Sequence, residues 1–360
     1  MNKSYFAMTL FTFNAIKIFV SATTATVFAV VWCPLLINYL YRYKLWKKEA
    51  RVKAISGEDA PIFHNLHKDK EVSVPRFGGL LIWVTALFVV FLFHFLAQIF
   101  GGKLFEHLDI LSRRETWLPL FTLIVASIVG FADDILQVFG RGKYVGGGMS
   151  FKSRLAIVVL IGLIGGWWFY YKLGVDTIHI PLMGDFSIGL FIIPLFILVM
   201  LACWSGGIID GLDGLAGGVF MAIFGAFTVI SFSVGMINLA AFCAVIFGTL
   251  LTFLWFNIPP ARFYMGETGM LGLTSVLAVV AFLTNSVIVL PIIAGLLVIE
   301  SGSVIIQLIS KKLRKKKVFL SSPIHHHFEA LGWPAYKVTM RFWVIGIILA
   351  IIGVAIRLLG

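Results

Sequence analysis

Long apolar runs alternate with shorter polar segments along most of this chain. A membrane-spanning helix needs about 20 mostly apolar residues. By this criterion the pattern predicts ten spanning helices: Asn14–Leu40, Phe77–Phe100, Thr116–Ile135, Arg154–Leu173, Ile188–Gly206, Leu215–Gly235, Met236–Asn257, Thr268–Thr284, Ser286–Ile309 and Phe342–Leu359. We therefore expect an all-α polytopic membrane protein, folded as a single integral membrane domain over residues 1–360.

The composition supports a membrane protein. Hydrophobic residues make up 60% of the chain and charged residues 13%, with a mean hydropathy of +0.99. Soluble domains average roughly 45–50% apolar and about 25% charged residues. The net charge of +12 would suggest nucleic acid in a soluble protein, but here orientation in the bilayer explains it more simply. We expect no nucleic-acid partner.

Positive charges predict the orientation of the chain. Most of the 29 Lys and Arg residues follow odd-numbered apolar runs, with dense groups between residues 42 and 76 and between residues 311 and 341. Cytoplasmic loops carry the excess of Lys and Arg in membrane proteins. The loops after odd-numbered runs are therefore predicted to be cytoplasmic, with both termini outside. The first run exceeds the apolar core of a signal peptide, so we expect it to be retained.

The segment Ile208–Gly214 places two carboxylates, Asp210 and Asp213, between two membrane-length runs. Such charges are costly unless they face water, a cation or a ligand. Their spacing puts both on one face if the turn is helical. The surrounding glycines allow a backbone or a phosphate to approach closely. The alternative is a charged loop between two helices.

Other polar clusters also follow odd-numbered runs. Asp133-Asp134 closes the third, Glu267 follows the seventh, and His325-His326-His327 follows the ninth. By the predicted topology every unusual polar cluster falls on the cytoplasmic face. Loops that are far apart in sequence then form one layer, and we expect a candidate active site there.

The acids favour magnesium and phosphate chemistry. A helix C-terminus disfavours acids, so a divalent cation, a lysine or a proton is expected to hold Asp133 and Asp134. Mg²⁺ takes oxygen ligands, usually one or two carboxylates with waters and substrate phosphates. Acids and lysines together at a membrane surface suit phosphoryl transfer. The alternative is a set of interfacial acids that water solvates.

The remaining polar features leave more than one interpretation open. Tyr264 could stack on a flat base, or it could be an interfacial aromatic residue. The three histidines cannot all face one metal from one helix face, but imidazoles near phosphates can donate hydrogen bonds; otherwise they form a polar loop or bind metal adventitiously. The basic run Lys311–Lys317 suits anionic membrane lipids. The polar segment Ser56–Pro75 is interpreted as a flexible loop over a substrate.

These residues also carry a family resemblance. The matching segments are Arg76-Phe77-Gly78-Gly79, Gly130-Phe131-Ala132-Asp133-Asp134, Asp210-Gly211-Leu212-Asp213-Gly214-Leu215-Ala216, Asn257, Met265-Gly266, Pro323-Ile324-His325-His326-His327-Phe328-Glu329 and Arg341-Phe342-Trp343. In this order they resemble the phospho-N-acetylmuramoyl-pentapeptide transferases, within the superfamily of polyprenyl-phosphate N-acetylhexosamine-1-phosphate transferases. The HHHFE segment, followed by Gly332-Trp333-Pro334, resembles the muramoyl-pentapeptide branch in particular.

The resemblance implies a reaction. Undecaprenyl phosphate attacks the β-phosphate of UDP-N-acetylmuramoyl-pentapeptide, UMP leaves, and lipid I, a peptidoglycan precursor, remains in the membrane. It further implies Mg²⁺ as cofactor, the bacterial cytoplasmic (inner) membrane as location, membrane lipids as neighbours and a possible homodimer.

The resemblance also implies the site residues. Asp133, Asp134 and Glu267 match catalytic positions, and Glu267 with Asp133 are the expected metal ligands. Substrate binding is implied for Lys70, Asp210, Asp213, Asn257, Tyr264, Gln307, His325, His326 and His327. Tyr264 stands where the family has a phenylalanine under the uracil.

Four residues depart from the family pattern. Gly207 replaces a residue with a side-chain amide, Glu267 replaces an aspartate, Arg154 a lysine and Val158 a glutamine. The carboxylates remain, so we expect an active enzyme. A transferase for another UDP-N-acetylhexosamine and a non-catalytic membrane protein that binds lipid or nucleotide are the alternatives. A transporter is less favoured, because the acids are expected at the surface layer and not at the bilayer midplane.

Overall fold

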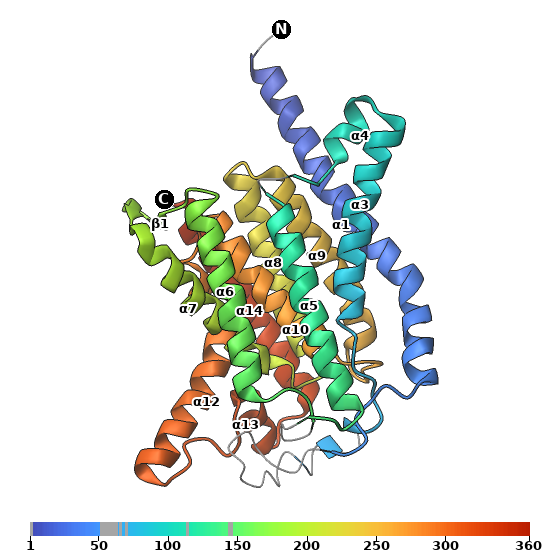
Figure 1. Ribbon diagram of the computed structural model, residues 1–360, viewed down its shortest axis with the longest axis vertical. Helices are drawn as coiled ribbons and strands as arrows, with labels where there is room; N and C mark the ends of the chain where they lie inside the picture. Colours follow the sequence, from blue (N-terminus) through green and yellow to red (C-terminus); the bar gives the residue numbers. More distant parts are fainter. Residues whose placement is uncertain (1–2, 51–63, 65–66, 69–70, 113–114, 143–146) are drawn as a thin grey trace.

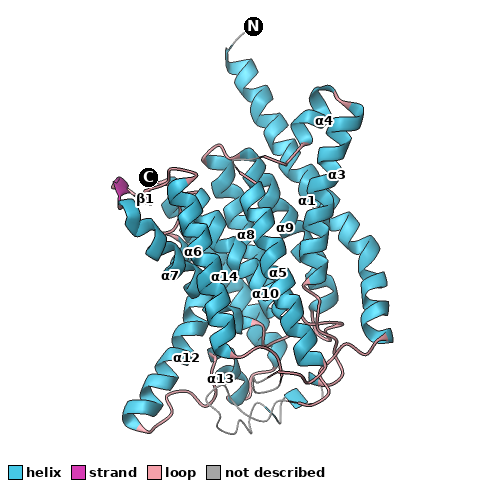
Figure 2. Ribbon diagram, viewed as in Figure 1, coloured by secondary structure: helices cyan, strands magenta, loops and turns pink. Residues whose placement is uncertain are grey.

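The computed structural model of the protein describes residues 3–50, 64, 67–68, 71–112, 115–142 and 147–360. Its helices are α1 (Lys3–Arg42), α3 (Leu80–Phe100), α4 (Gly102–Leu108), α5 (Trp117–Val138), α6 (Phe151–Tyr171), α7 (Ile192–Ser205), α8 (Leu215–Ser233), α9 (Ile237–Asn257), α10 (Gly266–Leu283), α11 (Leu290–Ile293), α12 (Gly295–Arg314), α13 (Ile324–Ala330) and α14 (Ala335–Leu358). Two 3₁₀ turns, η1 (Gly189–Phe191) and η2 (Gly206–Ile209), flank α7. Strands β1 (Thr177–Ile180) and β2 (Gly184–Ser187) form one antiparallel hairpin, the magenta element in Figure 2.

Within the described residues, nine helices are long and apolar enough to cross a membrane. They correspond to nine of the ten predicted spans, so the prediction of a helical polytopic membrane protein is confirmed. The helices pack as one bundle (Figure 1). The most apolar window of α10 is 89% buried and that of α14 is 28% buried. Helix α10 is therefore central, and its ends are positioned by neighbours on all sides.

The predicted ninth span, Ser286–Ile309, was wrong as a single helix. The structure breaks it into the one-turn α11 and the longer α12, and Ala294 between them lies outside helical geometry, with φ −97° and ψ 28°. Helix α12 includes Glu300 and Gln307 and ends in Lys311, Lys312 and Arg314, and it is not among the nine apolar helices. In Figure 1 it leans away from the bundle. The polar residues of α12 contact other segments at one end of the molecule, so α11 and α12 do not form one continuous membrane-spanning helix.

Both α1 and α14 have their chain-terminal ends at the same end of the bundle, the upper end in Figure 1. We call this the opposite end. The lower end holds the last turn of α5, the first turn of α10, and α13, and we call it the site end. The odd-numbered predicted spans do end there, as the topology predicted.

A second polar cluster lies at the opposite end, which corrects the expectation that every such cluster shares one face. The ammonium group of Lys17 donates to the backbone oxygen of Asp109 at 2.7 Å and to the side-chain oxygen of Asn238. The carboxylate of Glu115 accepts the N–H groups of Asn238 and Leu239 at the start of α9. The sequence did not reveal this cluster, because its residues lie in separate segments of the chain, one of them in the apolar helix α1.

Candidate active site

Asp134 joins the end of α5 to the start of α10. Its carboxylate accepts the backbone N–H of Glu267 at 3.1 Å, and both the N–H and the hydroxyl of Thr268 at 2.8 and 2.7 Å. Arg76 approaches the same carboxylate at 3.5 Å. The first N–H groups of a helix have no partner within the helix, and an anion there is also favoured by the helix dipole. Asp134 therefore caps α10 from a neighbouring helix.

Gly266 makes this cap possible. Its φ of +69° is a conformation that L side chains rarely adopt, and a Cβ there would stand 2.5 Å from a carboxylate oxygen of Asp134. Its own N–H donates to Asp210 at 3.2 Å. One glycine thus allows the α10 terminus to meet acids from two other segments.

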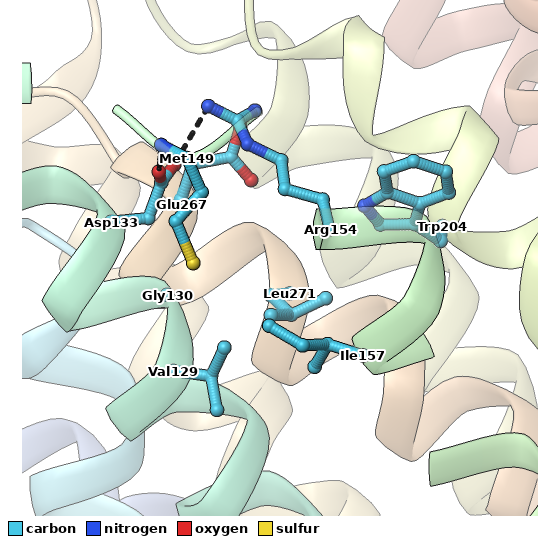
Figure 3. Close-up of a pocket in the computed structure, with 9 residues that line it drawn as sticks. All are labelled: Val129, Gly130, Asp133, Met149, Arg154, Ile157, Trp204, Glu267 and Leu271. Atoms are coloured by element: carbon cyan, nitrogen blue, oxygen red, sulfur yellow. Dashed lines mark hydrogen bonds and ion pairs between the residues drawn. The ribbon is translucent and has the colours of Figure 1, made fainter. Parts of the chain in front are cut away.

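Arg154 links the two other acids of this cluster (Figure 3). From the first turn of α6, its guanidinium lies 2.8 Å from the carboxylate of Asp133 and 2.7 Å from that of Glu267. Asp133 also accepts the side-chain N–H of Gln137 at 2.9 Å and the backbone N–H of Met149 at 2.5 Å. The planar fork of an arginine suits such a bridge, since it can serve two carboxylates at once. Arginines and a helix N-terminus thus hold the paired acids, where the sequence suggested a metal, a lysine or a proton.

A small pocket of about 10 Å³, room for roughly one water molecule, lies beside this bridge. Figure 3 shows Asp133, Arg154 and Glu267 on one side of it and Trp204 and Leu271 nearby. Ligand pockets usually measure roughly 300–1,000 Å³. The pocket is far smaller, so the charged side chains have to move apart before a phosphate group can bind between them.

Asp210 lies within the same layer as these acids. Burial raises the pKa of its carboxyl to about 6, although Arg76 and the hydrogen bond from Gly266 lower it. Burial also raises the pKa of the Tyr264 hydroxyl, and the nearby Asp213 and Asp210 raise it further. Asp210 accepts the N–H of Gly266 and Asp213 accepts that of Ala261, so both acids contact the loop that carries Tyr264.

The side chains of Asn257 and Asp213 serve the local backbone. Asn257 accepts the N–H of Gly214 at 3.0 Å and donates to the carbonyl oxygen of Phe263 at 2.6 Å. Asp213 accepts the N–H of Ala261 at 3.4 Å. These contacts fix the loop between α9 and α10 against the start of α8. A role in substrate binding stays a prediction for both residues.

The three consecutive histidines point to three different partners. The Nδ1 of His325 lies 2.9 Å from Glu300 of α12, and that of His326 lies 2.7 Å from Glu329 of α13. His327 instead accepts the N–H of Leu320 at 3.2 Å. The prediction that they cannot share one metal is confirmed. Only His325 and His326 approach the aspartate layer, because a Cβ on Gly211 would contact the Nε2 atoms of both.

Gln307 lies away from the acids. Its amide accepts the N–H groups of Val318 and Phe319 and donates to the carbonyl oxygen of Phe319, each at 3.0 Å. It therefore anchors the loop after α12, and its predicted contact with a nucleotide stays a prediction. Lys70 lies outside the described residues.

Several residues of this layer were not predicted as site residues: Arg76, Gln137, Arg154, Thr268 and Glu300. One of them had a clear signal in the sequence. Glu300 is an acid inside a predicted span, and such a residue marks a candidate functional site. Its side chain is fully buried, and its Oε1, like the Nε2 of His325, has no hydrogen-bond partner among the described residues. Both atoms could serve a ligand.

The acids have the donor chemistry of a magnesium site. All are oxygen donors, as Mg²⁺ requires. Contacts from the described residues to the Glu267 carboxylate reach only Oε1, which leaves Oε2 available. Three or more acids do not come close enough to form a complete ligand cluster in the described part of the chain. The residues fit an Mg²⁺ ion that also takes substrate phosphates as ligands, with Arg154 as a competing cation.

Comparison with known proteins identifies the family. Residues 116–285 match the family model described as glycosyl transferase family 4. A phospho-N-acetylmuramoyl-pentapeptide-transferase of Geobacillus sp. (strain WCH70) is 35% identical, over 91% of this chain and 94% of the relative. Those of Anoxybacillus flavithermus and Bartonella quintana are 34% and 36% identical, over 96% and 79% of this chain and 99% and 80% of the relatives. With relatives this similar over nearly their whole length, the chain belongs to the phospho-N-acetylmuramoyl-pentapeptide-transferase family.

Proposed function

We propose that the protein transfers phospho-N-acetylmuramoyl-pentapeptide from its UDP-linked form to undecaprenyl phosphate. A phosphate oxygen of the lipid bonds to the β-phosphorus, the bond between the two phosphates of the donor breaks, and UMP leaves. The product is lipid I for peptidoglycan synthesis. The observation that carries this proposal is the layer of acids and arginines at the start of α10, in a chain of this transferase family.

Arg76 and Arg154 are the phosphate-binding cations in this proposal. They come from the segment before α3 and from the start of α6, and each already lies against an acid of the site. Asp134 and Asp210 accept the first N–H groups of α10, so these groups are not available to bind a substrate phosphate. Asp134 is therefore a positioning residue, which holds α10 and Arg76 where the diphosphate must lie.

Glu267 and Asp133 are the proposed ligands of Mg²⁺. The ion would neutralise charge on the diphosphate and on the departing UMP. Arg154 now neutralises both carboxylates, so we expect weak metal binding until the donor brings its phosphates. Arg154 can then turn from the acids to a phosphate oxygen, a partner that suits its fork equally well.

The uridine side is proposed to lie at Tyr264, Asp210 and Asp213. Both aspartates contact the loop that carries Tyr264, which supports one shared uridine site. His325 and His326 flank it across Gly211. Because the Nδ1 of His325 faces the Glu300 carboxylate, its unpartnered Nε2 is suited to accept from a sugar hydroxyl, and in the imidazolium form to donate to a phosphate.

The site end is proposed to face the cytoplasm, with both termini outside, in the bacterial cytoplasmic membrane. Lys311, Lys312 and Arg314 in the last turn of α12 support this orientation, because cytoplasmic ends carry the excess of positive charge. Labelling of single cysteines with an impermeant reagent tests it: reaction at residue 359 in intact cells is expected, and protection there would reverse the orientation. A homodimer belongs to the same proposal and is tested by cross-linking in the membrane.

The central test is UMP release by the purified protein. The assay contains undecaprenyl phosphate and Mg²⁺, with UDP-N-acetylmuramoyl-pentapeptide and UDP-N-acetylglucosamine in parallel reactions. We expect turnover with the first donor only. Turnover with the second would move the protein to a sister branch. Donor binding without UMP release from either would indicate a protein that binds without catalysis.

A further inference from the structure

We propose that His67, His326 and Glu329 form a binding site for a transition-metal ion of the Zn²⁺ class, separate from the acids that are proposed to hold Mg²⁺. The ligand atoms of these three side chains all lie within 4.8 Å of one another. In the described part of the chain, no other group of three His, Cys, Asp or Glu residues comes this close. The proposal does not depend on the transferase reaction.

The distances are close to those of a bound ion. The Nε2 of His67 lies 3.1 Å, and the Nδ1 of His326 2.7 Å, from the same oxygen of Glu329. A tetrahedral Zn²⁺ has bonds of about 2.0–2.2 Å to nitrogen and oxygen, which keeps neighbouring ligand atoms roughly 3.3 Å apart. The two separations to Glu329 need to widen by up to roughly 0.6 Å to reach this value, and the two nitrogen atoms lie within 4.8 Å of each other. A small movement of the three side chains is therefore enough to surround an ion.

The donor types select the metal. Two imidazoles and one carboxylate suit Zn²⁺, Co²⁺, Ni²⁺ or Cu²⁺, whereas Mg²⁺ is bound by oxygen ligands. Two histidines with one glutamate leave a fourth position for water or another ligand, as in zinc sites with an open coordination position. The proposed site should therefore fill in the presence of excess Mg²⁺.

The surroundings hold the ligands in place. The exposed fraction of each side chain is small, 11% for His67 and 7% for His326 and Glu329. The His326 ring lies against the His325 ring, with centroids 4.1 Å apart, and His325 is fixed by Glu300 of α12. Outer contacts of this kind orient metal ligands and strengthen binding.

A metal here would join two separate parts of the site end. His67 precedes α3, whereas His326 and Glu329 belong to α13, which lies next to Gly211 and the aspartate layer. The ion would cross-link these segments and fix α13 beside the proposed uridine pocket. Binding to the folded state alone also raises stability by mass action.

The experiment uses the full chain in detergent after treatment with a chelator. Co²⁺ is added in the presence of excess Mg²⁺, and visible absorption reports tetrahedral coordination. Calorimetry with Zn²⁺ gives the stoichiometry and affinity. We expect one ion per chain and a rise in Tm. Several weak, equivalent ions, or a spectrum of six-coordinate Co²⁺ only, would overturn the proposal and leave the three residues as a hydrogen-bonded contact.

Variants locate the ion. His326→Gln and His67→Gln should each weaken Zn²⁺ binding by about a hundredfold or more, and Glu329→Asp should retain part of it. His327→Gln is the matched control, because it is the next histidine of α13 but contacts Leu320 instead. Tm without metal shows whether each variant is folded. Equal losses in the control, or none in the folded His326 and His67 variants, would contradict the assignment.

Discussion

Both ends of the bundle bury charged side chains, and they pair them in different ways. At the opposite end, Lys17 and Glu115 contact backbone groups and an amide, and Glu115 caps α9. At the site end, Asp134 likewise caps α10, but Arg154 joins two carboxylates from different helices. Buried atoms without a partner among the described residues occur at both ends, at the Nε2 of His107 and at atoms of His325 and Glu300, so the bridge by Arg154 is the difference between them.

This difference separates charges that serve only the fold from charges that can also serve a ligand. A bridge between like charges costs stability when its cation leaves, since two desolvated carboxylates then repel each other. Such an arrangement is useful where a substrate phosphate or a metal ion exchanges with the arginine.

Replacement of Asp134 tests the comparison with the largest expected effect. Asp134→Asn weakens the cap of α10 and leaves Arg76 without its nearest anion, so turnover should fall on the order of 10²- to 10³-fold, with a lower Tm. UMP release and thermal unfolding measure the two effects. The control is Glu115→Gln, which weakens the cap of α9 at the opposite end and should lower Tm while activity stays within about twofold. Equal losses of activity in both would remove the distinction between the ends.

Two glycines with positive φ provide a matched pair. Gly266→Ala combines backbone strain at φ +69° with a Cβ placed against Asp134, whereas Gly235→Ala has φ +80° and open space around the Cβ. Strain alone costs of order 1–3 kcal/mol, and we expect Gly266→Ala to lose at least about tenfold more activity. Thermal unfolding and UMP release are measured for both variants. If both lose the same Tm and activity, the contact between the new Cβ and Asp134 has no effect.

Arg154→Lys sharpens the interpretation of the bridge. A lysine is a point charge and cannot fork between Asp133 and Glu267, so competition with Mg²⁺ should weaken. We expect the Mg²⁺ concentration for half-maximal turnover to fall by about threefold to tenfold. Mn²⁺ binding without substrate, followed by paramagnetic resonance, provides a second readout. If the variant instead needs more Mg²⁺ for half-maximal turnover and binds Mn²⁺ more weakly, the arginine supports metal binding and does not compete with it.

The pH dependence of stability should carry a smaller signature of Asp210. Its pKa is raised to about 6 in the folded protein, above roughly 3.9 in an unfolded chain. Between these values the folded state binds more protons, so stability falls as pH rises from about 4 to about 6. Asp210→Asn removes this contribution. The Tm of the variant relative to the unsubstituted protein should therefore rise across this window and stay constant above it; a constant difference throughout would exclude the effect.

The residues of the site show what sequence could anticipate. Long apolar runs and the distribution of lysine and arginine brought Asp133, Asp210, Glu267 and the histidines to one end, and the structure confirms that they meet there. The partner of each was not predictable. Arg76 and Arg154 are two of many basic residues near the ends of the apolar runs, and only packing selects them. The break at Ala294 was also not predicted, because the apolar residues continue through it and give no signal for the end of one helix and the start of the next.

The sequence by itself determined that the protein is a helical membrane bundle of this transferase family, and which end collects the acids. Bilayer thickness sets the length of an apolar span, and flanking positive charges favour its orientation in the membrane. Both features can be identified from short stretches of sequence. Only the tertiary structure decided that Asp134 caps α10, that Arg154 bridges Asp133 and Glu267, and that His67 meets Glu329. These contacts depend on distances of about 3 Å between segments distant in sequence, and such distances are set by the packing of the whole bundle.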